Sequence, residues 1–480
     1  MEFLLIYGTE MSHPFIHRQK FELVSPLFPP LGLLYIGRSL EDEGHHVELL
    51  DLFVEKDSIS EIKKKMTAVD AVGISVDNDS YNESAQLAHT IKNIDPSIPI
   101  IIGGPHCTLY PHDSLLNISA ADISVCGDGE QAIKDVAAGL SGGKSFAEIP
   151  GIYYREKHDI KPGLPPTFIE DLDSLPFPAR HLADKYDYGK CGETYLYRPK
   201  LTSMVTTRGC PFRCRYCLRH VLSNERFQQR SAQNVLDELS EINGTYGSVM
   251  IGDDTFLADK KRAHKIMDGL IELGSTVDVL IGGARVDSAD RDLYKKMKKA
   301  GVKAINFGIE SGNQDVLDFY NKRISLDQIR KAVRLSNEMN FFSTGTFILG
   351  APLETKRHIE QTIKFARSLP LDNVGFYPLS YRHGSDLWRE AVKNGLINEN
   401  EHEVIADSRR GLANFTQEEM LQFCNKALRR FYVRPTYMTK EFFKAFIAND
   451  FRQVKSLIET VLHPTHFHLH NTLARNKNPP

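Results

Sequence analysis

Three closely spaced cysteines, Cys210, Cys214 and Cys217, carry the most specific chemistry in this sequence. They follow an apolar, β-branched run at residues 201–207, and their spacing lets one loop direct several thiolates toward a single soft metal centre. Cysteine clusters of this kind bind iron–sulfur clusters. Three ligands leave one coordination position open for a substrate, whereas a structural site closes its coordination sphere. A loop zinc site, or three buried thiols without a metal, is also compatible with the spacing alone.

The residues around these cysteines make the interpretation more specific. Tyr216 places an aromatic ring beside the last cysteine, and three arginines offset the negative charge of thiolates and sulfides: Arg208, Arg213 and Arg215. The pattern Cys-x-x-x-Cys-x-aromatic-Cys resembles that of the radical S-adenosylmethionine (radical SAM) enzymes. The resemblance implies a [4Fe-4S] cluster held by the three cysteines. Its open iron would bind the amino and carboxylate groups of SAM, and the reduced cluster would cleave SAM to a 5′-deoxyadenosyl radical.

Length, charge and cysteine usage limit the class of protein. A chain of 480 residues suits two or three domains. A net charge of −3 offers no electrostatic support for general nucleic-acid binding. Seven cysteines, three of them clustered, favour a reducing cytosol over a disulfide framework, so we expect a cytoplasmic protein. Residues 1–7 suit a buried first strand rather than a signal peptide, and no apolar run is long enough to span a membrane.

Residues 1–140 alternate short apolar strands with amphipathic helices. Strands are expected near residues 3–7, 46–50, 71–76, 98–102 and 122–126. This alternation predicts an α/β domain with a doubly wound, Rossmann-like parallel sheet, in which ligands bind beyond the carboxyl ends of the strands. Four candidate binding residues lie at such ends: Ser75, Gly103, Gly104 and Gly127. The glycines also suit ordinary turns.

The order of short segments in this region supports a second resemblance. The segments are Pro-Leu-Gly-Leu-Leu-Tyr at 30–35, Val-Gly-Ile-Ser at 72–75, Gly-Gly-Pro-His at 103–106 and Gly-Asp-Gly-Glu at 127–130. They resemble the cobalamin-binding domain that precedes many radical SAM barrels. The motif Asp-x-His-x-x-Gly, which supplies a histidine to cobalt in other cobalamin proteins, is absent. The resemblance therefore implies cobalamin without a protein histidine ligand; a domain that has lost cobalamin remains an alternative.

Two further regions flank the central domain. Residues 141–195 are expected to form a linker, because prolines around Leu-Pro-Phe-Pro at 175–178 stiffen an extended backbone. The Leu-Asp-x-Leu-Pro-x-Pro pattern there resembles the connector of cobalamin-binding radical SAM proteins. Residues 396–480 predict a helical extension with an amphipathic helix at 423–432. Four histidines near the end suit either a metal site or an inert polar terminus: His463, His466, His468 and His470.

Residues 196–395 repeat a strand–helix unit six times. Strands are expected near residues 202–207, 247–253, 278–283, 304–309, 343–349 and 374–379, with helices at 232–242, 260–273, 290–299, 326–339 and 356–369. Six units predict a partial (β/α)6 barrel of TIM type, because a closed barrel needs eight. In such barrels the chemistry lies at the carboxyl ends of the strands, and the first of these ends carries the cysteines.

Six residues that follow the barrel strands are candidates for binding SAM: Asp253, Asp254, Arg285, Glu310, Ser311 and Gly350. The paired carboxylates suit an ammonium group and the planar guanidinium of Arg285 suits a carboxylate, with helix capping and a surface salt bridge as the alternatives. By resemblance to the family, Glu310 and Ser311 would meet ribose hydroxyls or the amino-acid moiety of SAM, and Gly350 would lie near adenine. No catalytic residue is assigned.

The resulting hypothesis is a cobalamin-dependent radical SAM enzyme that methylates an unactivated carbon of a small-molecule or lipid-like substrate. It would take electrons from a donor such as flavodoxin or ferredoxin. A cyclase, rearrangement or oxidoreductase reaction within the same architecture is the first alternative, because fold does not determine reaction. A methylthiotransferase acting on tRNA is disfavoured, since only Cys107 and Cys126 precede the linker. A non-catalytic corrinoid carrier or zinc-binding scaffold would cleave no SAM.

Overall fold

The computed structural model forms two compact units that divide between Asp187 and Tyr188. The residues described are 1–8, 28–55, 58–77, 81–191, 194–195, 197–435 and 437–439. The histidine-rich end predicted as a metal site or inert terminus lies outside them. The division into four parts at residues 140, 195 and 395 stays a prediction.

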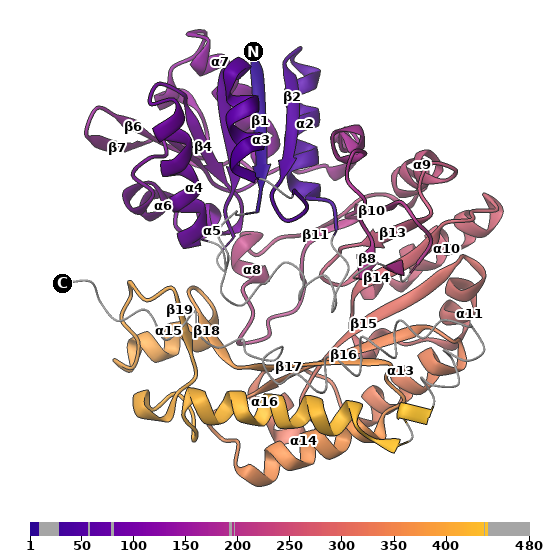
Figure 1. Cartoon of the computed structure of the whole chain (residues 1–480). Helices are drawn as coiled ribbons and strands as arrows, with labels where there is room; N and C mark the ends of the chain where they lie inside the picture. The colour runs from indigo at the N-terminus through magenta and orange to yellow at the C-terminus, as the bar shows by residue number, and fades with distance from the viewer. Residues whose placement is uncertain are drawn as a thin grey trace. The chain divides into compact units, whose positions relative to one another are not determined.

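The N-terminal unit is built on a seven-stranded sheet in the order β2-β1-β3-β4-β5-β6-β7 (Figure 1). Its strands are β1 (Glu2–Tyr7), β2 (His46–Asp51), β3 (Ala71–Ser75), β4 (Ile100–Gly103), β5 (Ile123–Val125), β6 (Ile152–Glu156) and β7 (Asp159–Pro162). Strands β1 to β5 are parallel, and β6 and β7 add an antiparallel edge. The order 2-1-3-4-5 is doubly wound, so the predicted Rossmann-like sheet is confirmed.

Helices cover both faces of this sheet. They are α2 (Leu31–Asp42), α3 (Ser58–Lys65), α4 (Tyr81–Ile94), α5 (Pro105–Leu109), α6 (Pro111–Asn117) and α7 (Gly129–Leu140). Helices α2 and α7 pack against each other. On the opposite face, α4 buries Leu87, Ala88 and Ile91 against strand residues such as Ile74. Ile91 follows Ala88 by three residues and Leu87 by four, which places all three on one side of the helix.

The proline-rich segment after the sheet is bonded to the N-terminal unit. The backbone N–H of Ala179 donates to the carbonyl of Leu34 (3.0 Å), and His181 lies 2.8 Å from the carboxylate of Glu41. The hydroxyl of Tyr186 accepts from the N–H of Asp51 at 2.9 Å. These contacts fix the segment against α2 and β2.

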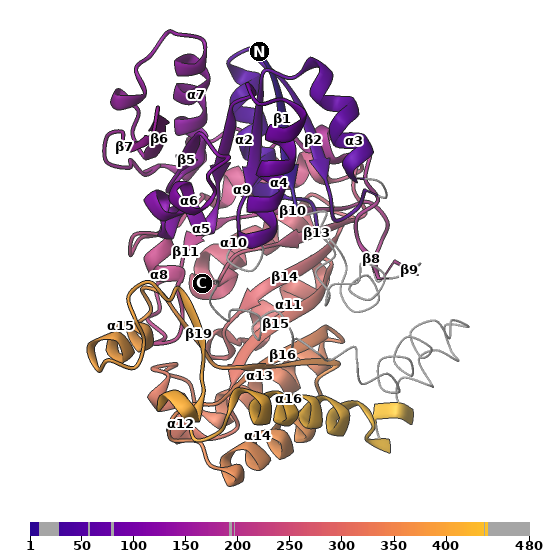
Figure 2. The same cartoon turned by 60° about the vertical axis from the view of Figure 1, so that its left-hand side comes forward.

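The C-terminal unit contains a six-stranded, fully parallel sheet in the order β10-β13-β14-β15-β16-β17. Its strands are β10 (Leu201–Met204), β13 (Ser248–Ile251), β14 (Asp278–Ala284), β15 (Val302–Glu310), β16 (Phe342–Leu349) and β17 (Asn373–Pro378). Figures 1 and 2 show these strands with helices outside them: α9 (Ala232–Ile242), α10 (Lys260–Glu272), α11 (Arg291–Lys299), α13 (Leu326–Glu338) and α14 (Lys356–Ser368). The predicted partial barrel of six units is confirmed.

Shorter elements complete this unit. They are β8 (Lys190–Cys191), β9 (Thr194–Tyr195), β11 (Thr207–Gly209), α8 (Arg219–Leu222), β12 (Phe227–Gln229), α12 (Gln314–Phe319), β18 (Ser380–Arg382), α15 (Asp386–Lys393), β19 (Glu403–Ile405) and α16 (Gln417–Tyr432). Helix α16 packs against α14 and β17 and contains the amphipathic segment predicted at 423–432. The β11–β12 hairpin has no counterpart in the sequence prediction.

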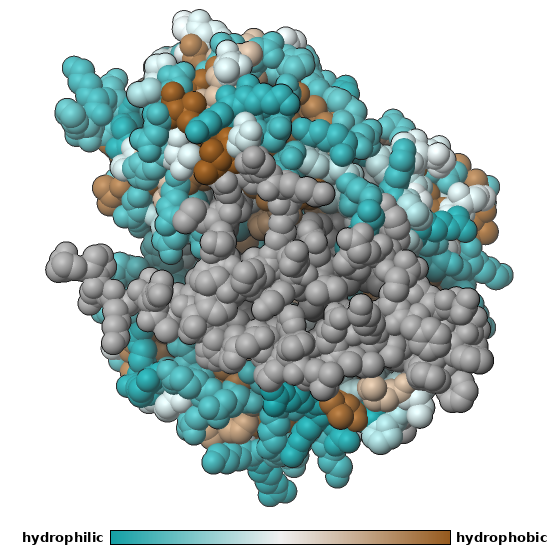
Figure 3. Space-filling model, viewed as in Figure 1, coloured by the Kyte–Doolittle hydropathy of each residue, from teal (hydrophilic) through white to brown (hydrophobic). Residues whose placement is uncertain are grey.

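On the face shown in Figure 3 the described surface is largely hydrophilic, with apolar side chains scattered over it. Among the residues described, no helix combines the length and the apolar character needed to cross a membrane.

Candidate active site

The three cysteines lie in one loop of the C-terminal unit, between the two strands of the β11–β12 hairpin. Pairing of Gly209 with Phe227 closes this loop at its base. Within the loop, the N–H of Cys217 donates to the carbonyl of Cys214 (3.0 Å), and the N–H of Arg219 donates to the Cys217 sulfur (3.5 Å). The hairpin therefore holds the three thiols on one short segment at the end of β10.

The chemistry of these thiols fits a cluster ligand set. Burial raises the pKa of Cys210 to about 11, with Asp254 adding to the shift, and burial likewise raises the pKa of Cys217. Both thiols are thus protonated at neutral pH and release their protons when they bind iron. Within the described ranges, no three His, Cys, Asp or Glu side chains converge on a single ion-sized point. A four-iron cluster needs its ligands wider apart than one ion does, because the cluster lies between them.

Asp253 holds the start of the cysteine loop. Its carboxylate is buried and accepts hydrogen bonds from the N–H and hydroxyl of Thr206, both at 2.5 Å, and from the N–H of Thr207 at 3.2 Å. Burial raises the pKa of Asp253, although these donors and Arg262 oppose the shift. The structure thus places this carboxylate against backbone donors at the end of β10.

Asp254 is oriented differently from its neighbour. It is only partly buried and pairs with the guanidinium of Arg219 at 3.0 Å. Burial raises the pKa of Asp254, and Arg219 opposes the shift. Because its charge acts on both Cys210 and Cys217, this carboxylate lies beside the cysteine loop.

Arg285, at the end of β14, also reaches the cysteine loop. Its guanidinium carbon lies over the Phe212 ring, 3.7 Å from the ring centre, a cation–π contact. Nitrogens of the same group donate to the carboxylate of Asp287 (2.9 Å) and to the carbonyl of Lys322 (2.7 Å). Arg285 therefore lies against the loop with its plane already fixed.

Glu310 ends β15 with a positive φ of 67°, a strained backbone for a residue other than glycine. Its buried carboxylate accepts from the ammonium of Lys322 at 2.7 Å, and the same ammonium lies 3.3 Å from the hydroxyl of Tyr216. Lys322 was missed from the sequence, because it lies in a loop where no periodic pattern marks it.

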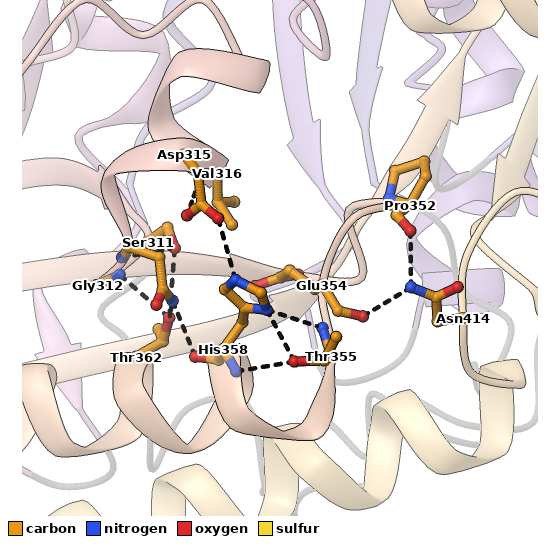
Figure 4. Close-up of polar contacts among 11 residues, drawn as sticks. Ser311, Gly312, Asp315, Val316, Pro352, Glu354, Thr355, His358, Thr362 and Asn414 are labelled. Atoms are coloured by element: carbon orange, nitrogen blue, oxygen red, sulfur yellow. Dashed lines mark hydrogen bonds and ion pairs between the residues drawn. The ribbon is translucent and has the colours of Figure 1, made fainter.

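Ser311 belongs to a separate buried network, shown in Figure 4. Its hydroxyl lies 3.3 Å from that of Thr362, and Asn313 donates to Thr362 at 2.9 Å. In the same view His358 contacts Asp315 and Thr355, an arrangement of Asp, His and Thr that resembles a catalytic triad. It is a helix cap instead, because the side chain and backbone of Thr355 bond His358 at the start of α14.

Gly350 follows β16 and lies in a turn held by Glu354. The N–H groups of Gly350 and Ala351 both donate to one carboxylate oxygen of Glu354, at 2.5 and 2.9 Å. Burial raises the pKa of Glu354 to about 7, although these two hydrogen bonds oppose the shift. Asn414 donates to the Pro352 and Glu354 carbonyls and closes the turn from outside (Figure 4).

The four candidate residues of the N-terminal unit lie at adjoining strand ends. Ser75 pairs with Gly103 across β3 and β4, and Gly104 has a φ of 110°. The hydroxyl of Thr108 donates to the carbonyl of Gly104 (3.0 Å) and accepts from the N–H of Gly127 (3.2 Å). The result is a strand-end surface made largely of backbone, which lets a large ligand approach closely.

The sequence candidates thus fall into three groups. The first group lies at the cysteine loop or contacts its partners: the three cysteines, Asp253, Asp254, Arg285 and Glu310. In the second group, Ser311 and Gly350 belong to separate networks. The third group is the set of strand-end residues in the N-terminal unit.

Comparison with known proteins agrees with this organisation. Residues 204–366 match the radical SAM superfamily and residues 24–137 match the B12 binding domain. The uncharacterized methyltransferase PH0819 of Pyrococcus horikoshii is 31% identical over 87% of this chain and 90% of its own length. The anaerobic magnesium-protoporphyrin IX monomethyl ester cyclase of Synechocystis is 27% identical over 70% of this chain and 67% of its own.

A solved structure shows the same fold. The radical SAM methyltransferase TsrM from Kitasatospora setae, with cobalamin and a [4Fe-4S] cluster bound, superposes with a TM-score of 0.67 at 18% identity. The match covers 82% of this chain and 78% of TsrM.

The chain therefore belongs to the radical SAM superfamily, among the members that carry a B12-binding domain. It is an enzyme of the class that uses a [4Fe-4S] cluster, SAM and cobalamin. The family resemblance predicted from the sequence is confirmed.

Proposed function

We propose that this protein methylates an unactivated carbon of a small-molecule or lipid-like substrate, with electrons from a flavodoxin- or ferredoxin-like donor. The observation that carries the proposal is the three-cysteine loop at the end of β10, in a chain that spans 90% of a methyltransferase relative and includes a B12 binding domain. When bound, the cofactors supply a carbon radical to activate the substrate and a methyl group to add to it.

The residues of the C-terminal unit would bind and orient these cofactors. Cys210, Cys214 and Cys217 would hold the cluster. Asp254 lies beside the loop and is suited to an ammonium group, and Arg285 presents a fixed guanidinium suited to a carboxylate. Together they match the two ends of the amino-acid part of SAM.

The remaining candidates would contribute less directly. Glu310 and Ser311 would bound the ribose or amino-acid moiety of SAM, and the Gly350 turn would adjoin adenine. Because Asp253 already accepts three hydrogen bonds, its proposed part is to hold the loop rather than to meet SAM.

In the N-terminal unit, the backbone at Ser75, Gly103, Gly104 and Gly127 would adjoin cobalamin without a histidine ligand to cobalt. The ring of His106 is buried, lies 2.9 Å from the Ser114 hydroxyl and stacks on Tyr81. These contacts support a role for His106 within the core of the unit.

The test is an anaerobic assay with reconstituted cluster, cobalamin, dithionite as reductant, and SAM that carries a deuterated methyl group. Methyl transfer predicts both 5′-deoxyadenosine and S-adenosylhomocysteine, with deuterated methylcobalamin formed on the protein. If S-adenosylhomocysteine and labelled cobalamin are both absent while 5′-deoxyadenosine forms, the methyltransferase proposal is wrong.

Oxidative ring closure is the second candidate, because the Synechocystis relative is named as a cyclase. A cyclase consumes SAM only for radical formation, so it predicts 5′-deoxyadenosine without transfer of the deuterated methyl group. The same assay therefore separates the two reactions before the substrate is known.

A further inference from the structure

A buried lysine lies beside the cysteine loop in the C-terminal unit. The side chain of Lys322 is 9% exposed, and its ammonium contacts the carboxylate of Glu310 (2.7 Å) and the hydroxyl of Tyr216 (3.3 Å). Tyr216 is the residue between Arg215 and the last cysteine, so this cation contacts the loop itself. Burial lowers the pKa of Lys322, but Glu310 and Cys214 raise this pKa by more. The pKa is therefore raised overall, and the ammonium stays charged.

The segment that carries Lys322 is fastened to the same loop at several points. Asn321 donates to the carbonyl of Arg213 (2.7 Å), and the N–H of Arg215 donates to the carbonyl of Tyr320 (3.0 Å). The Tyr320 ring packs edge-on against Tyr216, with centroids 5.1 Å apart. These contacts hold the segment against the loop and place the ammonium beside it.

The strand below leaves room for the ion pair. A Cβ added at Gly308 would lie 2.6 Å from the carboxylate oxygen of Glu310 and 2.9 Å from the ammonium of Lys322. The carboxylate of Glu310 lies in this space, and the backbone of Glu310 has a positive φ of 67°. The positive φ of Glu310, the absence of a side chain at Gly308 and the buried charges of Glu310 and Lys322 thus occur together at one position. An ion pair at the protein surface needs none of these features.

We propose that Lys322 is a positioning residue that raises the reduction potential of the cluster held by the cysteine loop, with Glu310 fixing the ammonium in place. Reduction adds one negative charge to a group already bound by three thiolates. A fixed cation in a poorly solvated site stabilises that added charge. This inference rests on the proposed cluster at the three cysteines and concerns a residue outside its ligand set.

The experiment measures the midpoint potential of the reconstituted full-length protein by mediated titration with dithionite, followed by EPR and absorbance, without SAM. In Lys322→Met, loss of the cation should shift the potential to more negative values. In Glu310→Gln, the cation is no longer offset and the potential should shift to more positive values. The double variant should lie between the two single variants.

Arg323→Met is the matched control, because it removes an exposed cation at the next residue and should leave the potential unchanged. Iron and sulfide contents are measured for every variant, so that only protein with a full cluster is compared. If Lys322→Met loses its cluster, Glu310→Gln still carries the test through the sign of its shift.

Shifts of the same sign in both single variants would indicate a loosened loop and overturn the inference, as would a Lys322→Met potential equal to that of the control. Failure of the wild-type protein to take up a cluster would instead overturn the proposed cluster site. The two proposals therefore fail in distinguishable ways.

Discussion

The carboxyl ends of the parallel strands differ in kind between the two units. In the N-terminal unit they present backbone, at residues such as Gly103 and Gly104. In the C-terminal unit they present charges that are already paired, at residues such as Asp254, Arg285 and Glu310. Bare backbone suits the close approach of a broad, nearly neutral ring system, whereas a cluster with thiolates and a charged SAM molecule need fixed charges around them. The same alternation of strands and helices therefore gives strand ends of two kinds, one that presents backbone and one that presents paired charges.

The largest effect is expected at the three cysteines, because their thiolates would carry the negative charge of the site in the C-terminal unit. Cys214→Ala removes one of the three proposed cluster ligands, so we expect loss of the brown iron–sulfur absorption and of SAM cleavage, measured by absorbance, iron content and 5′-deoxyadenosine formation. Cys424→Ala is the control, because Cys424 is buried in α16 and outside the loop. A Cys214→Ala protein that keeps its full iron content would contradict the assignment of the ligands.

The bare strand ends of the N-terminal unit provide the second prediction. Gly104→Ala adds a Cβ 3.0 Å from the carbonyl oxygen of Val76 at a φ of 110°, a strain of roughly 1–3 kcal/mol. We expect cobalamin affinity to fall at least tenfold while the cluster is retained, measured by equilibrium dialysis and iron content.

Gly142→Ala is its matched control, since Gly142 has a φ of 78° but no neighbour within 4 Å of an added Cβ. Equal cobalamin affinity in both variants would mean that the Gly104 turn does not adjoin cobalamin.

The third prediction compares the two adjacent aspartates that follow β13 in the C-terminal unit. Asp253→Asn disrupts a buried acceptor of three hydrogen bonds, at a cost of about 3 kcal/mol. Asp254→Asn loses a partly exposed pair with Arg219 and should cost less stability, but it should weaken SAM binding more. Denaturant unfolding and calorimetric titration with SAM measure the two effects. The reverse ranking in SAM affinity would exchange the roles of the two carboxylates.

The smallest effect is expected at Glu354, whose pKa is raised to about 7 by burial. Between its ordinary range and pH 7 the folded protein holds a proton that the unfolded chain releases, so stability falls as pH rises through this window. The fall should be about 2 kcal/mol from pH 5 to pH 7, and it should level off above pH 7.

Glu354→Gln cannot titrate, so this part of the pH dependence should disappear from denaturant unfolding curves measured at pH 5, 6 and 7. The same variant keeps an acceptor for the Gly350 and Ala351 N–H groups, which guards against loss of the turn. A wild-type pH dependence equal to that of Glu354→Gln over this range would contradict the raised pKa.

Long, regular elements were predictable because their periodicity is local. Helix α9 begins and ends at the residues expected, 232 and 242, from apolar side chains spaced three and four apart. The proposed cysteine ligand set and both family resemblances also came from short contiguous segments. These features depend on residues that are neighbours in the chain.

The β11–β12 hairpin, the pair of Lys322 with Glu310 and the cap formed by Thr355 and His358 were not predictable in the same way. Lys322 lies in a loop without periodic pattern. Its partner Glu310 ends the preceding strand β15, and its partner Tyr216 belongs to another strand–helix unit. The sequence also could not show which of Asp253 and Asp254 holds the backbone and which faces the cysteine loop. Successive side chains near a strand end point in opposite directions, and only the structure shows which direction each one takes.

The sequence by itself determined the two α/β units and the family, and it predicted the three cysteines as cluster ligands, since each of these follows from local spacing and order. Tertiary structure alone decided which charge faces which partner: Asp253 toward backbone donors, Asp254 toward the cysteine loop, and Lys322 into the space left by Gly308. The physical reason is that burial and pairing depend on contacts between distant segments, and these contacts set how each charge can act.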